Sequence, residues 1–150
     1  MNTKTALQKA TDLLARQDQS ERSLKRKLAA RNYAACEIDD AVDQLKRHNY
    51  LNDEESCARQ FERLYSEGKL SVNQIYAKLV QRGFETSLID KFLPPDVDEH
   101  EKNAALRALR TKFNRLQEDR KLYQHLSTRG FSGDAIIFAV EQFKSEFEAN

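Results

Sequence analysis

The side chains that could bind a metal ion or act as nucleophiles are few and scattered. His48, His100 and His125 have no metal-ligand spacing with one another or with Cys36 and Cys57, whereas zinc sites draw on closely spaced ligand pairs. The sequence contains no GxSxG, HExxH or DxDxDG pattern, the signatures of a hydrolase, a zinc protease and a calcium loop. Its four glycines are too far apart to form a phosphate-binding loop. We therefore expect no enzyme, and no metal ion or other cofactor.

Neighbouring carboxylates have a structural explanation. The pairs Asp39–Asp40 and Glu54–Glu55 lie where helices are expected to begin, and acidic side chains stabilise the positive N-terminal end of a helix. These pairs therefore do not indicate acid–base chemistry.

Basic side chains carry the strongest signal for binding. From Lys102 to Arg115 the chain has five basic residues and no acid, although 25 Lys and Arg almost balance 24 Asp and Glu over the whole sequence. If this stretch is one helix, its arginines lie opposite an apolar stripe that runs from Leu106 to Leu116. Such a face favours phosphate or an acidic protein surface. The candidate partner-binding residues are Arg22, Arg26, Arg59, Arg63, Lys78, Arg107, Arg110, Lys112, Arg115, Arg120 and Lys121.

One short motif occurs three times among the elements that must position these residues. Residues 28–33 read LAARNY, residues 79–84 read LVQRGF, and residues 126–131 read LSTRGF. A helix that ends in a Schellman motif places Gly, or less often Asn, at a position with positive φ, and the apolar residue after it contacts a side chain of the last turn. We therefore expect each motif to stop a helix, with the Asn or Gly in the left-handed conformation.

Apolar spacing and capping residues predict one helix before each motif and another after it. Ser20, Ser71 and Asp119 are good N-cap types at or near the start of the helices that precede the motifs. Each helix carries an apolar pair four residues apart, which is the spacing of one helical face. The pairs are Leu24–Leu28, Ile75–Leu79 and Leu122–Leu126 before the motifs, and Ile38–Val42, Ile89–Leu93 and Ile136–Val140 after them.

A longer helix precedes each of these helix pairs. The second long helix begins at residues 52–55 (NDEE), and in the third Asp98 and Glu101 have the spacing of a capping box. Pro94 and Pro95 close the second set, because proline cannot continue a helix.

The composition agrees with several small helical cores. Apolar residues make up 39% of the chain, and four glycines with two prolines leave little material for turns. A unit of about 50 residues buries little apolar surface alone, so neighbouring units should pack on one another. We predict an all-α protein of three tandem three-helix repeats, residues 1–51, 52–95 and 96–150, in an elongated, bowed array.

Targeting signals are lacking in the sequence. The N-terminal stretch MNTKTALQKATDLLARQDQ has no apolar core of a signal peptide. The longest apolar run, AIIFAV at residues 135–140, is far short of the ~20 residues that span a membrane. Two cysteines cannot crosslink three repeats, so a reducing compartment is expected. We predict a monomeric cytoplasmic protein with no membrane partner.

The order of these motifs resembles the RecX family of recombinase regulators over essentially the whole chain. The resemblance lies in an S-x-x-x-L-x-x-x-L helix at residues 20–28, the segment LNDEE at residues 51–55, and RGFSGDAI at residues 129–136. It implies tandem three-helix repeats that bind the RecA recombinase and its filament on single-stranded DNA. It further implies inhibition of the RecA ATPase, strand exchange and filament growth, which modulates DNA repair, recombination and the SOS response.

Two other functions stay open. A stand-alone, non-specific DNA-binding repeat protein would bind tightly with a steep salt dependence, although a net charge of +1 favours weak binding to single- or double-stranded DNA. A scaffold that joins unrelated partners would tolerate charge reversal at Arg107 and Arg110. Sequence-specific reading by the last helix of each repeat is disfavoured, because these helices carry acids such as Asp39, Asp90 and Asp134.

Overall fold

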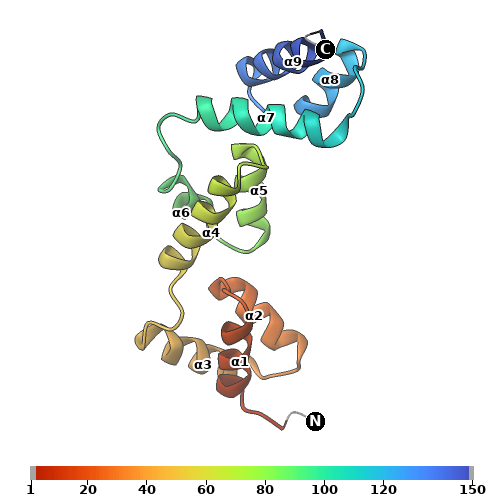
Figure 1. Ribbon diagram of the computed structural model, residues 1–150. Helices are drawn as coiled ribbons and strands as arrows, with labels where there is room; N and C mark the ends of the chain where they lie inside the picture. Colours follow the sequence, from red (N-terminus) through yellow and green to blue (C-terminus); the bar gives the residue numbers. More distant parts are fainter. Residues whose placement is uncertain (1–2, 149–150) are drawn as a thin grey trace. The chain divides into compact units, whose positions relative to one another are not determined.

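The protein is all-helical in the part of the chain that the structure describes, which confirms the predicted fold class. The computed structural model describes residues 3–148, and every regular element there is an α-helix (Figure 1). The helices are α1 (Ala6–Arg16), α2 (Glu21–Ala30), α3 (Ala35–Arg47), α4 (Asp53–Glu67), α5 (Val72–Gln81), α6 (Thr86–Asp90), α7 (Asp98–Lys112), α8 (Asp119–Ser127) and α9 (Gly133–Glu148).

The helices form two compact packing units. The first holds the chain up to Gln60 together with Leu79–Phe92, and the second holds Phe61–Lys78 together with the chain from Leu93 onward. Helices α4 and α5 therefore contribute residues to both units. The division into repeats at 1–51, 52–95 and 96–150 stays a prediction, and residues 1–2 and 149–150 of those ranges lie outside the described residues.

Each unit has its own apolar core, built from the residues that the helical spacing selects. The core of the first unit joins α1, α2 and α3, and that of the second joins α7, α8 and α9. The first consists of Ala10, Leu13, Leu24, Leu28, Ile38, Val42, Leu45 and Leu51. The second consists of Ala104, Ala105, Leu106, Leu109, Leu122, Leu126, Phe131, Ala135, Ile136, Ala139, Val140 and Phe143.

The three predicted helix stops are confirmed. Asn32, Gly83 and Gly130 have φ of 66°, 98° and 74°, the left-handed conformation that a Schellman motif requires. The backbone N–H of the following aromatic residue donates to the carbonyl five positions before, at 3.4 Å for Tyr33, 3.2 Å for Phe84 and 3.4 Å for Phe131.

Within the first packing unit, the stop of α5 lies against the beginning of α2. The hydroxyl of Ser20, the N-cap of α2, accepts the N–H of Ser23 (3.0 Å) and donates to the carbonyl of Arg82 (2.6 Å). The carboxylate of Asp53 accepts the N–H of Glu21, the first residue of α2 (2.8 Å). We call Ser20, Asp53, Arg82 and Gly83 the first junction.

Within the second packing unit, the stop of α8 meets the beginning of α5 through the same contacts. The Ser71 hydroxyl accepts the N–H of Gln74 (3.0 Å) and donates to the carbonyl of Arg129 (2.5 Å). The carboxylate of Glu101 accepts the N–H of Val72, the first residue of α5 (3.3 Å). We call Ser71, Glu101, Arg129 and Gly130 the second junction.

The junctions explain why two stops use glycine and one uses asparagine. A Cβ on Gly83 would lie 2.6 Å from Ser20 Oγ, and a Cβ on Gly130 would lie 3.0 Å from Asn73 Cβ. Asn32 is exposed, so its side chain has room and the backbone conformation is the main requirement there. The motif therefore both stops a helix and lets the end of that helix approach the beginning of another helix closely.

Two predicted helices are shorter than the apolar spacing indicated. Helix α7 ends at Lys112, because Phe113 turns to an extended backbone (φ −120°, ψ 128°). Leu116, predicted to continue the apolar stripe, is 47% exposed. Helix α6 is a five-residue segment, Thr86–Asp90, and Leu93 lies beyond its end. Leu116 and Leu93 matched the spacing of a helix that had already ended.

The predicted capping box of the third long helix is wrong. Val97 is the N-cap of α7 and makes no side-chain capping bond, while the Glu101 carboxylate is committed to the second junction. A capping box occurs instead at α1, where Thr5 and Gln8 bond reciprocally.

Candidate functional site

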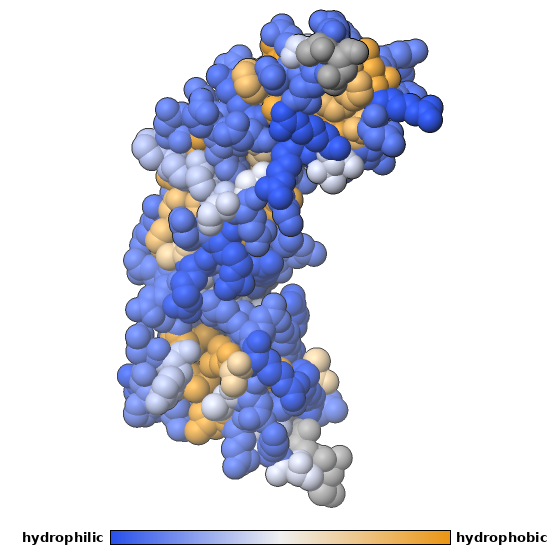
Figure 2. Space-filling model, in the orientation of Figure 1, coloured by the Kyte–Doolittle hydropathy of each residue, from blue (hydrophilic) through white to orange (hydrophobic). Residues whose placement is uncertain are grey.

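All eleven candidate basic residues are exposed, and they are divided between the two packing units. Arg22, Arg26 and Arg59 belong to the first packing unit, and the remaining eight belong to the second. The face seen in Figure 2 is mostly hydrophilic, with separate apolar patches. Among the described residues, the candidates differ mainly in whether an acid neutralises them.

Arg22 and Arg26 on α2 are not neutralised by an acidic side chain among the described residues. They lie four residues apart on one face of the helix, and neither has an ion pair within residues 3–148. Their neighbour Lys25 is paired, with Glu21 at 3.3 Å and Asp39 at 3.7 Å. The hydrogen bond with Glu21 raises the pKa of Lys25. Helix α2 therefore offers two unneutralised guanidinium groups.

Arg59 and Arg110 are held by acids. The guanidinium of Arg59 makes two bonds of 3.2 Å with the carboxylate of Asp18. Arg110 makes a bidentate pair with Glu146, and this hydrogen bonding raises the pKa of Arg110. A partner would have to compete with these carboxylates, so the two arginines are weaker candidates than the sequence indicated.

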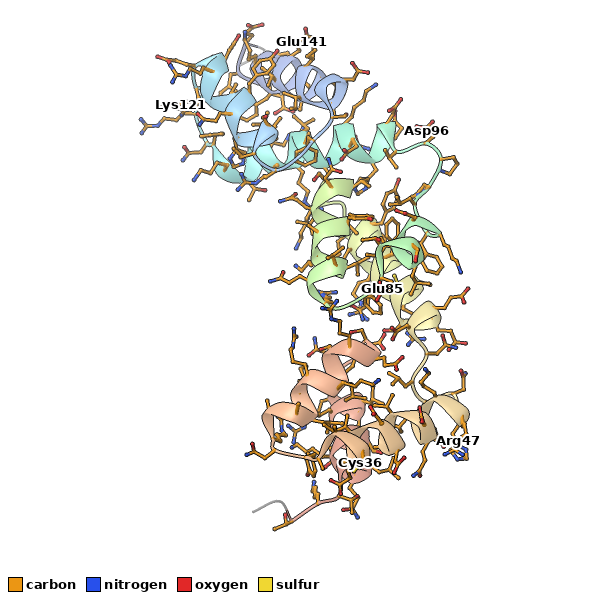
Figure 3. All side chains as sticks on the ribbon, turned by 180° about the vertical axis from the view of Figure 1, so that it is seen from behind. Cys36, Arg47, Glu85, Asp96, Lys121 and Glu141 are labelled. Atoms are coloured by element: carbon orange, nitrogen blue, oxygen red, sulfur yellow. The ribbon has the colours of Figure 1, made fainter. Side chains whose placement is uncertain are left out.

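The helical face proposed for residues 102–115 is interrupted. Because α7 ends at Lys112, Arg115 lies in the connection to α8 and not on the helix. Arg115, Arg120 and Lys121 have no ion pair in the described part of the chain, and Figure 3 shows Lys121 on α8 reaching away from the helix. Arg63 and Lys78 are also exposed and have no ion pair within that part of the chain.

A basic cavity lies within the second packing unit. It measures about 540 Å³ and is lined by Lys69, Arg107, Ala108, Thr111, Lys112, His125 and Arg129. These residues come from the α4–α5 connection, from α7, and from the end of α8 with the residues after it. None of the lining residues is acidic, so four cations face one open space with no acid among them. We call this set the basic cavity.

Backbone carbonyl groups, and for Arg129 also the imidazole of His125, hold the two arginines of the basic cavity. Arg107 Nη1 donates to the carbonyl of Glu67 at the end of α4 (2.8 Å). Arg129 Nη1 lies 3.1 Å from both the carbonyl oxygen and Nδ1 of His125. Carbonyl groups at helix ends carry only partial negative charge, so they orient a guanidinium without neutralising it as a carboxylate would. The two arginines are therefore held in position with no acid paired to them.

The environment of His125 disfavours the protonated imidazole. Burial of the ring, followed by the nearby charges of Arg129 and Lys112, lowers the pKa of His125 below its usual value. The Phe113 ring packs edge-on against the imidazole of His125, with the two ring centroids 5.4 Å apart. Because Arg129 can only donate, Nδ1 of His125 must be the acceptor, and the ring proton lies on Nε2.

Three titratable members of the basic cavity, Lys69, His125 and Arg129, were not among the candidates. Arg129 was interpreted as part of a helix stop, and His125 was considered only as a metal ligand. Lys69 lies in the connection after Gly68, and no local pattern links it to α7. Only tertiary packing brings Lys69, Arg107 and Arg129 around one space.

An apolar hollow lies in the first packing unit. It measures about 660 Å³ and includes Leu7 and Leu14 of α1, Leu45 of α3, and Tyr50. Tyr50 is 73% exposed. The hollow contains no arrangement of polar groups that suggests chemistry.

The described residues contain no group of three or more His, Cys, Asp or Glu side chains that could hold a metal ion. Of the helices in residues 3–148, none is both long and apolar enough to cross a membrane. Cys57 is buried, and burial raises the pKa of its thiol to about 11.

Comparison with known sequences places the chain near one group of regulators. A family model described as RecX, first three-helix domain, matches residues 6–45. The chain is 32% identical over 142 residues to a regulatory protein RecX of Caldanaerobacter subterraneus, covering 93% of this chain and 71% of that protein. It is 31% identical over 140 residues to a regulatory protein RecX of Neisseria gonorrhoeae, covering 89% of this chain and 87% of that protein.

Solved structures show the same fold. A crystal structure of RecX from Lactobacillus salivarius matches with a TM-score of 0.72, covering 93% of this chain and 95% of that one, at 17% identity. A second crystal structure, of a regulatory protein RecX, also has a TM-score of 0.72 at 23% identity. At these identities the likeness supports the fold alone.

Proposed function

The chain belongs to the RecX family of regulatory proteins, and we propose that it binds the RecA recombinase and its filament on single-stranded DNA. Binding would inhibit ATP hydrolysis, strand exchange and filament growth, and so modulate DNA repair and the SOS response. The observation that carries this proposal is 32% identity to a regulatory protein RecX over 93% of this chain. RecA is a cytoplasmic partner, so we place this protein in the cytoplasm.

The unneutralised arginines support binding to an acidic protein surface. Arg22, Arg26 and Arg115 are exposed and have no ion pair among the described residues, so they can pair with a partner without first losing an internal contact. Arg59 and Arg110 contribute less, because Asp18 and Glu146 compete for them.

The test is the ATPase of RecA on single-stranded DNA with added protein. We expect substoichiometric amounts to slow hydrolysis and shorten filaments. The double substitution Arg26→Glu/Arg115→Glu should weaken inhibition at least tenfold, because two attractive contacts become repulsive. Lys91→Glu is the matched control, since Lys91 is exposed at the end of α6 and outside the candidate set. Unchanged hydrolysis and filament length with the native protein would exclude the proposal.

Direct DNA binding is the second candidate, favoured by the acid-free lining of the basic cavity. It predicts that the protein binds DNA without RecA, with an affinity that falls steeply between 50 and 200 mM salt. RecA inhibition that persists at salt concentrations where the protein no longer binds DNA would separate the two functions.

A further inference from the structure

We propose that the basic cavity is a binding site for a single phosphate group. This inference rests on the proposed function only for its biological setting, because the site itself is defined by Lys69, Arg107, Lys112 and Arg129. Three arguments favour phosphate: the charge of the lining, the directions from which the cations come, and the way the arginines are held.

The charge of the lining is +4 with no acid to offset it. Lys69, Arg107, Lys112 and Arg129 are the charged groups of the cavity, and His125 is a titratable group whose pKa is lowered by burial and by Arg129 and Lys112. The whole protein carries a formal net charge of +1, so this is a local concentration and not a share of a general excess. Cations that converge without acids repel one another, and a bound anion relieves that repulsion.

The cations approach from three separate elements. Lys69 comes from the α4–α5 connection, Arg107 and Lys112 from α7, and Arg129 from the stop after α8. A carboxylate is planar and is satisfied by one guanidinium fork on one side. A phosphate presents oxygens in several directions, so donors from three elements suit it better. The Thr111 hydroxyl on the same lining is already committed, because it donates to the carbonyl of Arg107 (2.9 Å).

The arginines are oriented before any ligand arrives. Arg107 is fixed by the carbonyl of Glu67, and Arg129 is fixed by the carbonyl and Nδ1 of His125. Oriented side chains lose less conformational freedom on binding. Arg59 and Arg110 differ from these two arginines, because each is neutralised by a carboxylate. The basic cavity therefore brings together two arginines that are both held in position and not neutralised by an acid.

The experiment measures phosphate binding in the absence of RecA. The probes are inorganic phosphate, ATP and an eight-nucleotide single strand of DNA, with a ten-residue glutamate peptide as the carboxylate probe. The chain has only three histidines, so the proton resonances of His48, His100 and His125 can be followed separately by NMR. Phosphate in the cavity should shift the His125 resonance and raise its titration midpoint, leaving His48 as an unperturbed reference.

The variant Lys69→Gln/Lys112→Gln removes two charges from the lining. The side chains of Lys69 and Lys112 make no hydrogen bond or ion pair in the described part of the chain, so we expect the fold to survive, with an unchanged circular dichroism spectrum. Affinity for the phosphate probes should fall at least tenfold. The control Lys91→Gln should change it less than twofold.

The outcomes separate the possible ligands. Loss of inorganic phosphate, ATP or DNA binding in the double variant supports the site, and the probe with the highest affinity identifies the source of the phosphate. The proposed phosphate site is overturned if the native protein and the double variant bind the phosphate probes equally, or if none of the three phosphate probes binds. Equal affinity for the glutamate peptide would assign the cavity to an acidic protein segment and would also overturn the phosphate assignment. Persistence of RecA inhibition in the double variant would leave the proposed function standing whatever the cavity binds.

Discussion

The two junctions share their backbone contacts but use their arginine side chains differently. In the first junction, Arg82 Nη1 donates to the side-chain oxygen of Gln60 (2.8 Å), which is itself buried. In the second, Arg129 contacts His125 and lines the open basic cavity. In both, the carbonyl of the arginine accepts a serine hydroxyl.

This difference indicates that the repeated motif fixes the backbone contacts of the junction, whereas the contacts of the arginine side chain are free to vary. The helix stop, the serine contact and the glycine recur because helix-to-helix approach depends on them. The guanidinium is not needed for that approach, so one copy binds internally and the other faces a cavity. A repeat can therefore acquire a binding role without a change in its packing.

The largest expected effect comes from the stop glycines. Gly83→Ala should lower the free energy of unfolding by about 2–4 kcal/mol, because alanine is strained at positive φ and its Cβ would meet Ser20 Oγ. The loss of unfolding free energy in Gly130→Ala should be similar or somewhat smaller, since its Cβ would lie 3.0 Å from Asn73 Cβ. Urea unfolding measures both.

Asn32→Gly is the matched control for these substitutions. Asn32 has the same backbone conformation but is exposed, so we expect a change within about 1 kcal/mol. Labelling of the buried thiol of Cys57 should accelerate in Gly83→Ala if the first junction opens locally, whereas the exposed Cys36 should react at an unchanged rate. A neutral Gly83→Ala would show that close approach at the junction is not required.

The junction serines come next. Ser20→Ala and Ser71→Ala each remove an N-cap acceptor and the donor to an arginine carbonyl. We expect each to cost about 1–3 kcal/mol in thermal or urea unfolding. Ser132→Ala tests the cap alone, because Ser132 accepts the N–H of Ala135 at the start of α9 and is exposed. Equal losses for all three would mean that the serine-to-carbonyl bond contributes little.

The smallest effect is a pH dependence that distinguishes Glu101 from its glutamine variant. Burial raises the pKa of Glu101 and also that of Asp53 in the first junction. The folded state therefore holds these protons more tightly than the unfolded state, so their contribution to stability is present at acidic pH. It is lost as pH rises through the unfolded and then the folded pKa.

Glu101→Gln keeps an acceptor for the Val72 N–H but cannot titrate. We expect the stability of the native protein relative to Glu101→Gln to fall as pH rises above the ordinary pKa of glutamate, and then to level off. Urea unfolding of both proteins between pH 4 and 8 measures this difference. A native-minus-variant difference that rises with pH would mean that the Val72 N–H stabilises the charged carboxylate more than burial destabilises it.

Rules that use only neighbouring residues were enough to predict the helix stops and most of the core residues from the sequence. The φ values at Asn32, Gly83 and Gly130 follow from a motif of six residues, because a Schellman stop depends only on the last turn of a helix. The same rules failed at Leu93 and Leu116, where apolar spacing continues past the end of the helix. Periodicity reports which face is apolar, but it does not report whether the backbone is still helical.

The candidate site depended more on distant residues. The sequence identified eleven exposed basic residues, but it could not show that Arg59 and Arg110 are paired with Asp18 and Glu146, far away in the chain. It also assigned Glu101 to a local capping box, although its partner Val72 lies on another helix. These contacts join segments with no fixed spacing, so local patterns do not encode them.

The amino-acid sequence was sufficient to predict the helix stops, most of the apolar faces and the family, because each of these depends on short-range spacing or on overall likeness to relatives. The tertiary structure alone decided which charges are neutralised, why Gly83 and Gly130 are glycine, and which cations meet in the basic cavity. The physical reason is that charge pairing and close approach depend on distances between helices, and those distances are set only when the cores pack.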